Sequence, residues 1–145
     1  MNVVIGSDHG GFELKQVLTA HLKSKGIEVL DVGCYDTNSV DYPDIAEKAA
    51  KELLSGGYEF GILVCGTGIG ISIAANKIKG IRCAVVANEY CAEMTKRHNN
   101  ANMLSFGGRV IGSDLAKNIL DAYLNAEFEG GRHQNRIDKI SALEE

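Results

Sequence analysis

The stretch that decides the fold is Gly61-Ile-Leu-Val-Cys-Gly-Thr-Gly-Ile-Gly-Ile-Ser-Ile-Ala-Ala-Asn76. Its apolar beginning, from Phe60 to Val64, predicts a buried strand, and the apolar residues from Ile71 onward predict a helix. Between strand and helix stand three alternating glycines, namely Gly66, Gly68 and Gly70. Such a turn points several backbone N–H groups at one place, which suits an anion. Because Cys65 ends the strand there, where the helix dipole favours a thiolate, we interpret the stretch as a base beside an oxyanion hole.

Two nucleotide-binding motifs have a similar glycine-rich form. The P-loop needs a lysine and then a serine or threonine after its last glycine, but Ile71-Ser72 stands there. The dinucleotide fingerprint needs a third glycine where Ile71 and Ile73 stand. A non-catalytic nucleotide-binding module, with Glu89 as its ribose-binding acid, stays an alternative but leaves Cys65 unexplained. A redox-sensing thiol protein is a weaker alternative, because no resolving cysteine lies near Cys65 in the sequence.

The composition of the 145 residues is typical of one globular domain, with 45% hydrophobic and 23% charged residues. A net charge of −4 gives no support for binding nucleic acid or a membrane surface. The first residues do not resemble a signal peptide, and no apolar run is long enough to span a membrane. The four cysteines form no C-x-x-C pair and have no metal-type spacing with histidines. We therefore expect a cytoplasmic protein with a single domain over residues 1–145 and no metal.

Strands and helices alternate along the whole chain. Strands are predicted over residues 3–7, 27–32, 60–65, 81–87 and 103–106, each followed by a helix, and Ser113 is the predicted N-cap of the penultimate helix. Pro43 fits the first position of the helix after the second strand, and a last helix begins near Arg132. This alternation predicts an α/β fold of three layers, with a five-stranded parallel sheet covered by helices on both faces and an extra C-terminal helix.

Parallel sheets bind ligands at the carboxyl ends of their strands. Three groups of residues are predicted to meet at that edge. They are Asp8 and His9 after the first strand, the Cys65-to-Gly70 turn, and Arg109 after the fifth strand.

Two further groups of residues are candidates for chemistry near the sheet. His98 lies at the end of a predicted helix, whose dipole favours an imidazolium that can act as an acid. The alternative for His98 is a helix cap, with Asn99 in a left-handed turn. Arg132 and Arg136 stand four residues apart on the last helix, where both can bracket a phosphate.

The alternative for the two arginines is a solvated basic face, or pairing with acidic neighbours, namely Glu127, Glu129 or Asp138. Because the preceding helix runs away from the carboxyl edge, the arginines are expected not to reach Cys65 of their own chain. We therefore predict a dimer in which the arginines of one subunit close the site of the other.

Six motifs occur together in one order. They are Gly6-Ser-Asp-His9, Asp41-Tyr-Pro43, Cys65-Gly-Thr-Gly-Ile-Gly70, Ala74-Ala-Asn-Lys77, Arg97-His-Asn99 and Gly130-Gly-Arg-His-Gln-Asn-Arg136. In these motifs the chain resembles the type B ribose-5-phosphate isomerases and the related allose- and galactose-6-phosphate isomerases. The resemblance implies a Rossmann-like fold, no cofactor, and a homodimer or dimer of dimers with shared active sites. It also implies isomerisation of ribose 5-phosphate to ribulose 5-phosphate through a cis-enediolate, with another aldose phosphate, such as allose 6-phosphate, as the open alternative.

The resemblance implies a role for each matched residue. Cys65 resembles the base that moves a proton between C2 and C1, Thr67 a partner for hydroxyl protons, and His98 the group that helps to open the furanose ring. The family's hole for the enediolate is matched by the amides of Gly66, Thr67, Gly68, Ile69 and Gly70. Sugar hydroxyls would be held by Asp8 and Asn99, and the phosphate by His9, Arg109, Arg132 and Arg136.

Overall fold

The computed structural model describes residues 1–145 and contains one five-stranded sheet in which every pairing is parallel. The strands are β1 (Asn2–Ser7), β2 (Glu28–Asp31), β3 (Phe60–Cys65), β4 (Cys83–Val85) and β5 (Met103–Gly107), in the order β2-β1-β3-β5-β4. The helices are η1 (His9–Gly11), α1 (Phe12–Ser24), α2 (Tyr42–Leu54), α3 (Ile69–Ala75), α4 (Glu89–Asn99), α5 (Ser113–Leu124) and α6 (Arg132–Ala142). The predicted alternation of strands and helices is confirmed.

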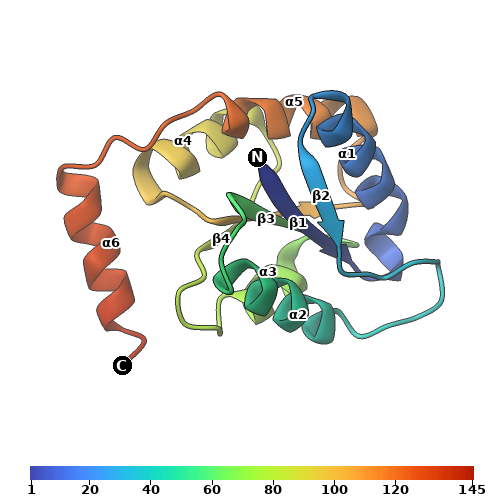
Figure 1. The fold of residues 1–145 in the computed structure, drawn as a ribbon, viewed down its shortest axis with the longest axis horizontal. Coiled ribbons are helices and arrows are strands. Elements are labelled where there is room, and N and C mark those ends of the chain that lie inside the picture. Colours follow the sequence, from blue (N-terminus) through green and yellow to red (C-terminus); the bar gives the residue numbers. More distant parts are fainter.

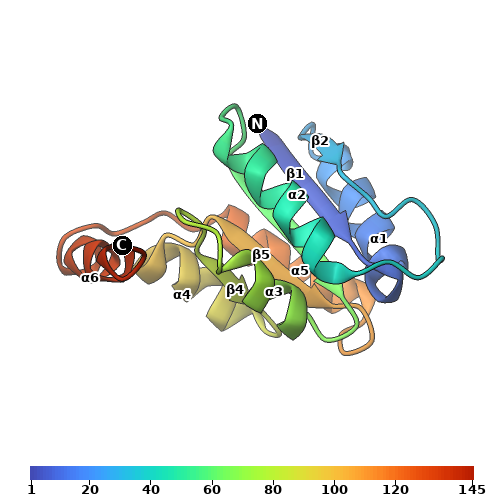
Figure 2. The ribbon, with the colours of Figure 1, turned by 90° about the horizontal axis from the view of Figure 1, so that it is seen from below.

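The sheet is the middle of three layers (Figures 1 and 2). Helices α1, α4 and α5 cover one face, and α2 and α3 cover the other. Along β3, successive side chains point to opposite faces, so Ile62 and Val64 join the first core and Leu63 and Cys65 the second. All six residues of β3 are buried, which its continuous apolar run predicted.

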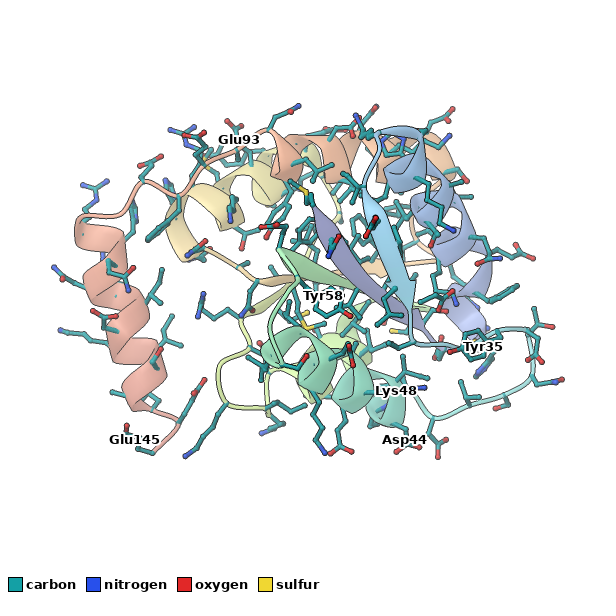
Figure 3. All side chains as sticks on the ribbon, in the orientation of Figure 1. Tyr35, Asp44, Lys48, Tyr58, Glu93 and Glu145 are labelled. Atoms are coloured by element: carbon teal, nitrogen blue, oxygen red, sulfur yellow. The ribbon has the colours of Figure 1, made fainter.

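Helix α2 shows how the sequence sets one layer. Its buried positions are Ala46, Ala49, Ala50 and Leu53, whose spacing of three and four residues forms one stripe against the sheet. Asp44 and Lys48 are exposed and lie on the outer side of the helix, where Figure 3 labels them. The helix begins at Tyr42, so Pro43 is its second residue and not, as predicted, its first.

Further predicted positions at the ends of elements are wrong. Ser113 is not an N-cap but the first helical residue, because the extended backbone of the residue before it, Gly112, takes the cap position. Strand β4 covers only Cys83–Val85 of the predicted 81–87, since it lies at the sheet edge and pairs with β5 alone. At the end of α4, the left-handed residue is Asn100, with φ of 43°, and Asn99 is still helical.

Helix α6 is the predicted extra helix, and it lies beside α4, away from the sheet (Figures 1 and 2). Its buried residues are His133 and Ile137, whereas Arg132 and Arg136 are exposed. Near its end, the Glu144 carboxylate accepts the Gly80 amide at 3.1 Å. None of the helices has both the length and the apolar character needed to cross a bilayer.

Candidate active site

Cys65 lies at the carboxyl end of β3, and its sulfur faces the glycine turn. The Gly68 amide donates to Cys65 Sγ at 3.1 Å, and the Gly108 amide donates to the Cys65 carbonyl at 2.8 Å. The residue is only 5% exposed, because it also packs in the core under α2 and α3. The sulfur thus accepts a backbone N–H from the turn. The predicted position of Cys65 beside the turn is confirmed.

The turn that holds this amide is fixed to β5. The Gly68 carbonyl accepts a hydrogen bond from Ser105 Oγ, a fully buried side chain, at 2.8 Å. Gly68 has φ of 80°, and a Cβ there would lie 2.9 Å from the Phe106 carbonyl carbon. Only glycine fits such a position without moving the backbone.

Two amides of the predicted oxyanion hole already have partners inside the turn. The Gly68 amide binds Cys65 Sγ, and the Ile69 amide donates to Thr67 Oγ1 at 3.1 Å. Thr67 itself is exposed, so its hydroxyl lies at the mouth of the turn. An anion bound here would share these amides with the sulfur and the hydroxyl.

Asp8 and His9 follow β1 at the same edge, as predicted. Asp8 Oδ1 accepts the Gly11 amide at 3.1 Å and caps η1, and the Asp8 amide donates to the Val64 carbonyl of β3 at 3.1 Å. His9 Nδ1 accepts the Val40 amide at 3.3 Å. Since an acceptor nitrogen carries no proton, this bond leaves Nε2 of the neutral ring as the donor.

Arg109 also lies at this edge, within the same chain as Cys65. Its amide donates to the Gly66 carbonyl at 3.0 Å. A methyl group built on Gly66 would lie 3.3 Å from Arg109 Nη1, and one built on Gly10 would lie 3.4 Å from Cζ. The guanidinium therefore lies over the turn, where it can pair with a phosphate.

Tyr42 is a further residue at this edge to which sequence reasoning assigned no role. A methyl group built on Gly70 would lie 2.8 Å from Tyr42 Cζ and 3.1 Å from its hydroxyl oxygen. The phenol thus covers the beginning of α3. The motif Asp41-Tyr-Pro43 was the available signal, but the sequence does not reveal that α2 begins beside α3.

His98, Asn99, Arg132 and Arg136 do not join this group within one chain. Helix α4 runs back across the sheet, and soon after it the Asn102 carbonyl accepts the amide of Gly61, the second residue of β3. Gly61 and Cys65 are roughly 13 Å apart along the strand, at about 3.3 Å per residue. The predicted site residues therefore fall into two groups, one at each edge of the sheet.

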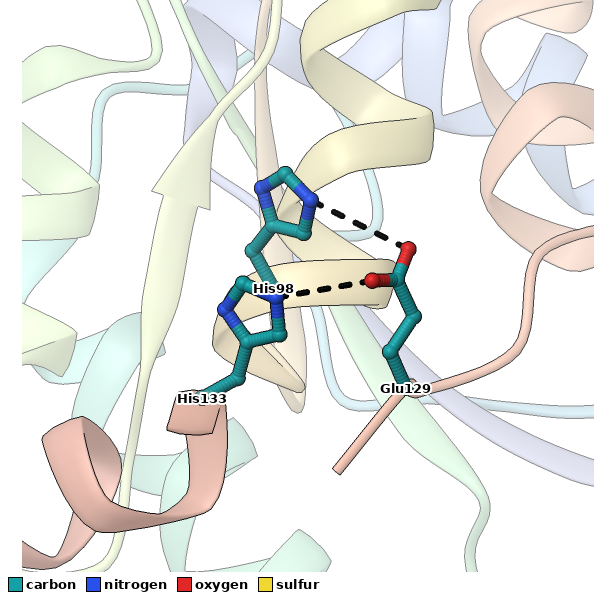
Figure 4. A group of neighbouring side chains, drawn as sticks. All are labelled: His98, Glu129 and His133. Atoms are coloured by element: carbon teal, nitrogen blue, oxygen red, sulfur yellow. Dashed lines mark ion pairs between the residues drawn. The ribbon is translucent and has the colours of Figure 1, made fainter. Parts of the chain in front are cut away.

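The second group is centred on a cluster of His98, Glu129 and His133 (Figure 4). The two imidazole rings are stacked, with centroids 4.3 Å apart and an interplanar angle of 11°. Glu129 lies 3.9 Å from His98 Nε2 and 3.4 Å from His133 Nε2, and it accepts a hydrogen bond from Arg97 Nε at 2.6 Å. The hydrogen bond from Arg97 holds the pKa of the Glu129 carboxyl below its usual range.

This arrangement excludes pairing with acidic neighbours for the arginines of α6, and it leaves the phosphate-binding and solvated-face interpretations open. Glu129 pairs with Arg97, and Asp138 accepts a hydrogen bond from Gln134. Neither Arg132 nor Arg136 lies within 4.0 Å of a carboxylate, and both are exposed. Two guanidinium groups four residues apart are thus free to bind an anion.

The same cluster is the group of side chains that comes closest to a metal site, since its ligand atoms lie within 4.8 Å of one another. Two features disfavour a metal. Arg97 already occupies one Glu129 oxygen and places a positive charge beside it. In addition, two nearly parallel stacked rings cannot both point a nitrogen lone pair at one ion, as Zn²⁺ coordination requires.

The fold and the first group of residues define a Rossmann-like α/β protein with a cysteine and an amide-rich turn at the carboxyl edge of its sheet. The chain belongs to the Ribose/Galactose Isomerase family, whose model matches residues 3–140. It is 48% identical to ribose-5-phosphate isomerase B of Escherichia coli (strain K12), over 99% of this chain and 96% of that protein.

Solved structures support the same family. Ribose-5-phosphate isomerase B of Clostridium thermocellum is 53% identical and matches with a TM-score of 0.98, covering 99% of this chain and 97% of that one. Ribose-5-phosphate isomerase B of Mycoplasma genitalium, solved with bound ribulose 5-phosphate, is 43% identical and matches with a TM-score of 0.93. The match covers 99% of this chain and 95% of that one. The predicted family and fold are confirmed.

Proposed function

We propose that this protein is an aldose–ketose isomerase that interconverts ribose 5-phosphate and ribulose 5-phosphate, acting as a single domain over residues 1–145. The observation that carries the proposal is the contact of 3.1 Å from the Gly68 amide to Cys65 Sγ, at the edge where parallel sheets bind ligands. Membership of a family that includes ribose-5-phosphate isomerases B supports the substrate.

The chemistry follows from the positions of the groups. Cys65 as thiolate takes the proton from C2 of the open-chain aldose, and the electron pair moves to O1, giving a cis-enediolate. The thiol then returns that proton to C1, while Thr67 exchanges protons with the two oxygens. Each amide that binds the developing oxyanion is worth about 2.7–4 kcal/mol, and positioned proton transfer contributes about 10²–10⁴ in rate.

We further propose that each site is completed by a second copy of the chain. His98, Asn99, Arg132 and Arg136 lie at the opposite edge from Cys65, so one chain cannot bring both groups to one sugar phosphate. In a two-fold dimer, the ring-opening and phosphate-binding residues of one subunit would face the turn of the other, and a closed pair would have two equal sites.

Exposed apolar surface supports this dimer. Ile69 and Ile73 on α3, beside the turn, are 54% and 58% exposed. A groove of about 580 Å³ lies between α6 and the rest of the chain, and its lining includes Asn99, Ile81, Ile140 and Leu143. Pairing the face beside the turn with this groove would bury both surfaces.

A cytoplasmic location is also proposed, supported by four free cysteines.

The test of the catalytic proposal uses Cys65→Ala with Cys91→Ala as its control, because Cys91 is exposed and lies on α4. We expect Cys65→Ala to lose isomerisation and to keep measurable binding of ribose 5-phosphate by calorimetry. Retained turnover would place the base elsewhere. A panel of aldose phosphates, including allose 6-phosphate, ranked by kcat/KM would identify the preferred sugar, and calorimetry with nucleotides tests the binding-module alternative.

Complementation tests the shared site. Chains carrying Cys65→Ala are mixed with chains carrying both Arg132→Ala and Arg136→Ala, each inactive alone. If sites are shared, a mixed dimer contains one intact site and recovers up to half of the activity of a normal dimer. No recovery in a verified mixed dimer would show that each chain builds its own site.

A further inference from the structure

The cluster of His98, Glu129 and His133 joins three separate parts of the chain. His98 lies in the last turn of α4, Glu129 in the connection from α5, and His133 in the first turn of α6. The Glu129 amide also donates to the Arg97 carbonyl at 3.0 Å, so backbone and side chain both fix this connection to the end of α4. His133 is 8% exposed although it is a polar side chain on an outlying helix. Its burial against His98 needs an explanation beyond helix packing.

We propose that Glu129 and His133 are positioning residues for His98, holding its imidazole in one plane and one tautomer so that Nδ1 faces the sugar ring. This inference rests on the proposed isomerase function, in which His98 helps to open the furanose of a substrate. Neither residue needs to touch the substrate. They act through the ring that does.

Stacking fixes the plane of the His98 ring. With centroids 4.3 Å apart and planes 11° apart, the His133 ring covers one face of the His98 ring and prevents rotation toward α6 (Figure 4). His133 is itself held, because Glu129 lies 3.4 Å from its Nε2. A side chain that is packed on one face and paired at one atom keeps its geometry without help from substrate, which is the condition for efficient general acid catalysis.

The charge of the carboxylate, at ion-pair distance and not hydrogen-bonded, favours one nitrogen of His98 for the proton. Glu129 faces Nε2 at 3.9 Å, so a proton on that nitrogen lies toward the anion, and Nδ1 stays available for the sugar. Ring opening breaks the C1–O4 bond and forms C1=O1. The imidazolium gives the proton of Nδ1 to O4. The imidazole then accepts the proton of the anomeric hydroxyl on Nδ1, so His98 is an imidazolium again when the ring has opened.

The charges around the pair set its response to pH. Arg97 comes from α4, Glu129 from the connection, and His133 from α6, while Arg82, before β4, donates to the carbonyls of Asn99 and Asn100. Glu93 of α4 also pairs with Arg97, at 3.2 Å, and Glu129 is the only carboxylate within 4.0 Å of the two imidazoles.

The first experiment compares Glu129→Gln with Glu127→Gln, an exposed glutamate two residues away in the same connection. Each is assayed on ribose 5-phosphate and on 4-deoxyribose 5-phosphate, which lacks O4 and cannot close a furanose ring. We expect Glu129→Gln to lower kcat/KM about tenfold on ribose 5-phosphate, a part of the ~10²–10⁴ available from proton transfer, and less than twofold on the acyclic analogue. Equal losses on the two sugars, or no difference from Glu127→Gln, would overturn the inference.

The pH profile on ribose 5-phosphate separates positioning from simple support of the fold. Removing the anion in Glu129→Gln disfavours an imidazolium, so the alkaline fall in kcat/KM moves to lower pH. His133→Phe keeps a flat ring for stacking but removes the competitor for Glu129, so the same fall moves to higher pH. Shifts in the same direction, or none in either variant, would contradict the inference.

A third measurement does not depend on turnover. ¹⁵N spectra of histidine-labelled protein report the tautomer of His98, and we expect one tautomer with Nε2–H in the unaltered chain and a mixture in Glu129→Gln. If the unaltered protein failed to isomerise either sugar, the proposed function would be rejected while these spectra still decided the positioning. Identical His98 spectra in both proteins would overturn it.

Discussion

Replacing Gly68 with alanine adds one methyl group at the position where the turn, the base and β5 meet. The backbone of Gly68 is left-handed, with φ of 80°, and its amide donates to Cys65 Sγ. A Cβ there would lie 2.9 Å from the carbonyl carbon of Phe106 and 3.1 Å from the amide of Gly107. Because β5 is an interior strand of the sheet, its backbone cannot retreat. The turn must move instead, and its amide moves away from the sulfur.

Gly26 supplies a matched control for the backbone cost. It has φ of 77° and no atom within 4 Å of an added Cβ. Gly26→Ala should therefore lower the free energy of unfolding only by the cost of the left-handed conformation, about 1–2 kcal/mol. Gly68→Ala should lose the same free energy of unfolding and a further ~1–3 kcal/mol, because its added Cβ crowds β5. Loss of one aligned donor from the site lowers kcat by about 10²–10³. The two variants should therefore differ modestly in stability and greatly in rate.

Two assays separate the effect of each substitution on stability from its effect on turnover. Urea unfolding gives the free energy of unfolding of each variant, and steady-state turnover of ribose 5-phosphate gives kcat. We expect Gly26→Ala to be destabilised with an unchanged kcat. A Gly68→Ala protein with kcat within threefold of Gly26→Ala would refute the idea that this amide is placed for catalysis.

Three further predictions concern a lysine and two cysteines away from the turn. Lys15 is fully buried and donates to both carboxylate oxygens of Asp31, so Lys15→Met should lower the free energy of unfolding in urea by about 3–5 kcal/mol, whereas exposed Lys48→Met should change little. Burial raises the pKa of the Cys83 thiol to about 12. Since the unfolded thiol loses its proton at lower pH than the folded one, stability should fall as pH rises from about 9 to 12, and Cys83→Ala should lessen that fall. Iodoacetamide at pH 8.5, followed by mass spectrometry, should label exposed Cys91 well before Cys83.

The sequence predicts the sheet and the first half of the site well, because both depend on local patterns. The run from Phe60 to Cys65 is wholly buried as its apolar character indicates, and the glycines after it form the turn. Asp8, His9 and Arg109 follow strands whose carboxyl ends share one edge, so topology alone brings them near Cys65.

Contacts between elements were not predictable in the same way. The spacing of the apolar residues shows which face of α2 is buried, but it does not show that Tyr42 lies against Gly70 of α3. The choice between Gly112 and Ser113 as N-cap depends on the backbone direction into α5, which a serine in the sequence does not reveal. Glu129 was expected as a possible partner of the α6 arginines, and its pairing with Arg97 depends on how the connection folds back over α4.

The division of the site between two edges follows from the connectivity of the fold. In a parallel sheet, a helix that leaves the carboxyl end of one strand must return the chain to the amino end of the next. A residue at the end of such a helix, as His98 is on α4, therefore lies at the amino edge whatever its side chain. Cys65 ends a strand and lies at the carboxyl edge for the same reason. No substitution within this topology can join the two, so a sugar phosphate that contacts both groups would lie between two chains, as in the proposed dimer.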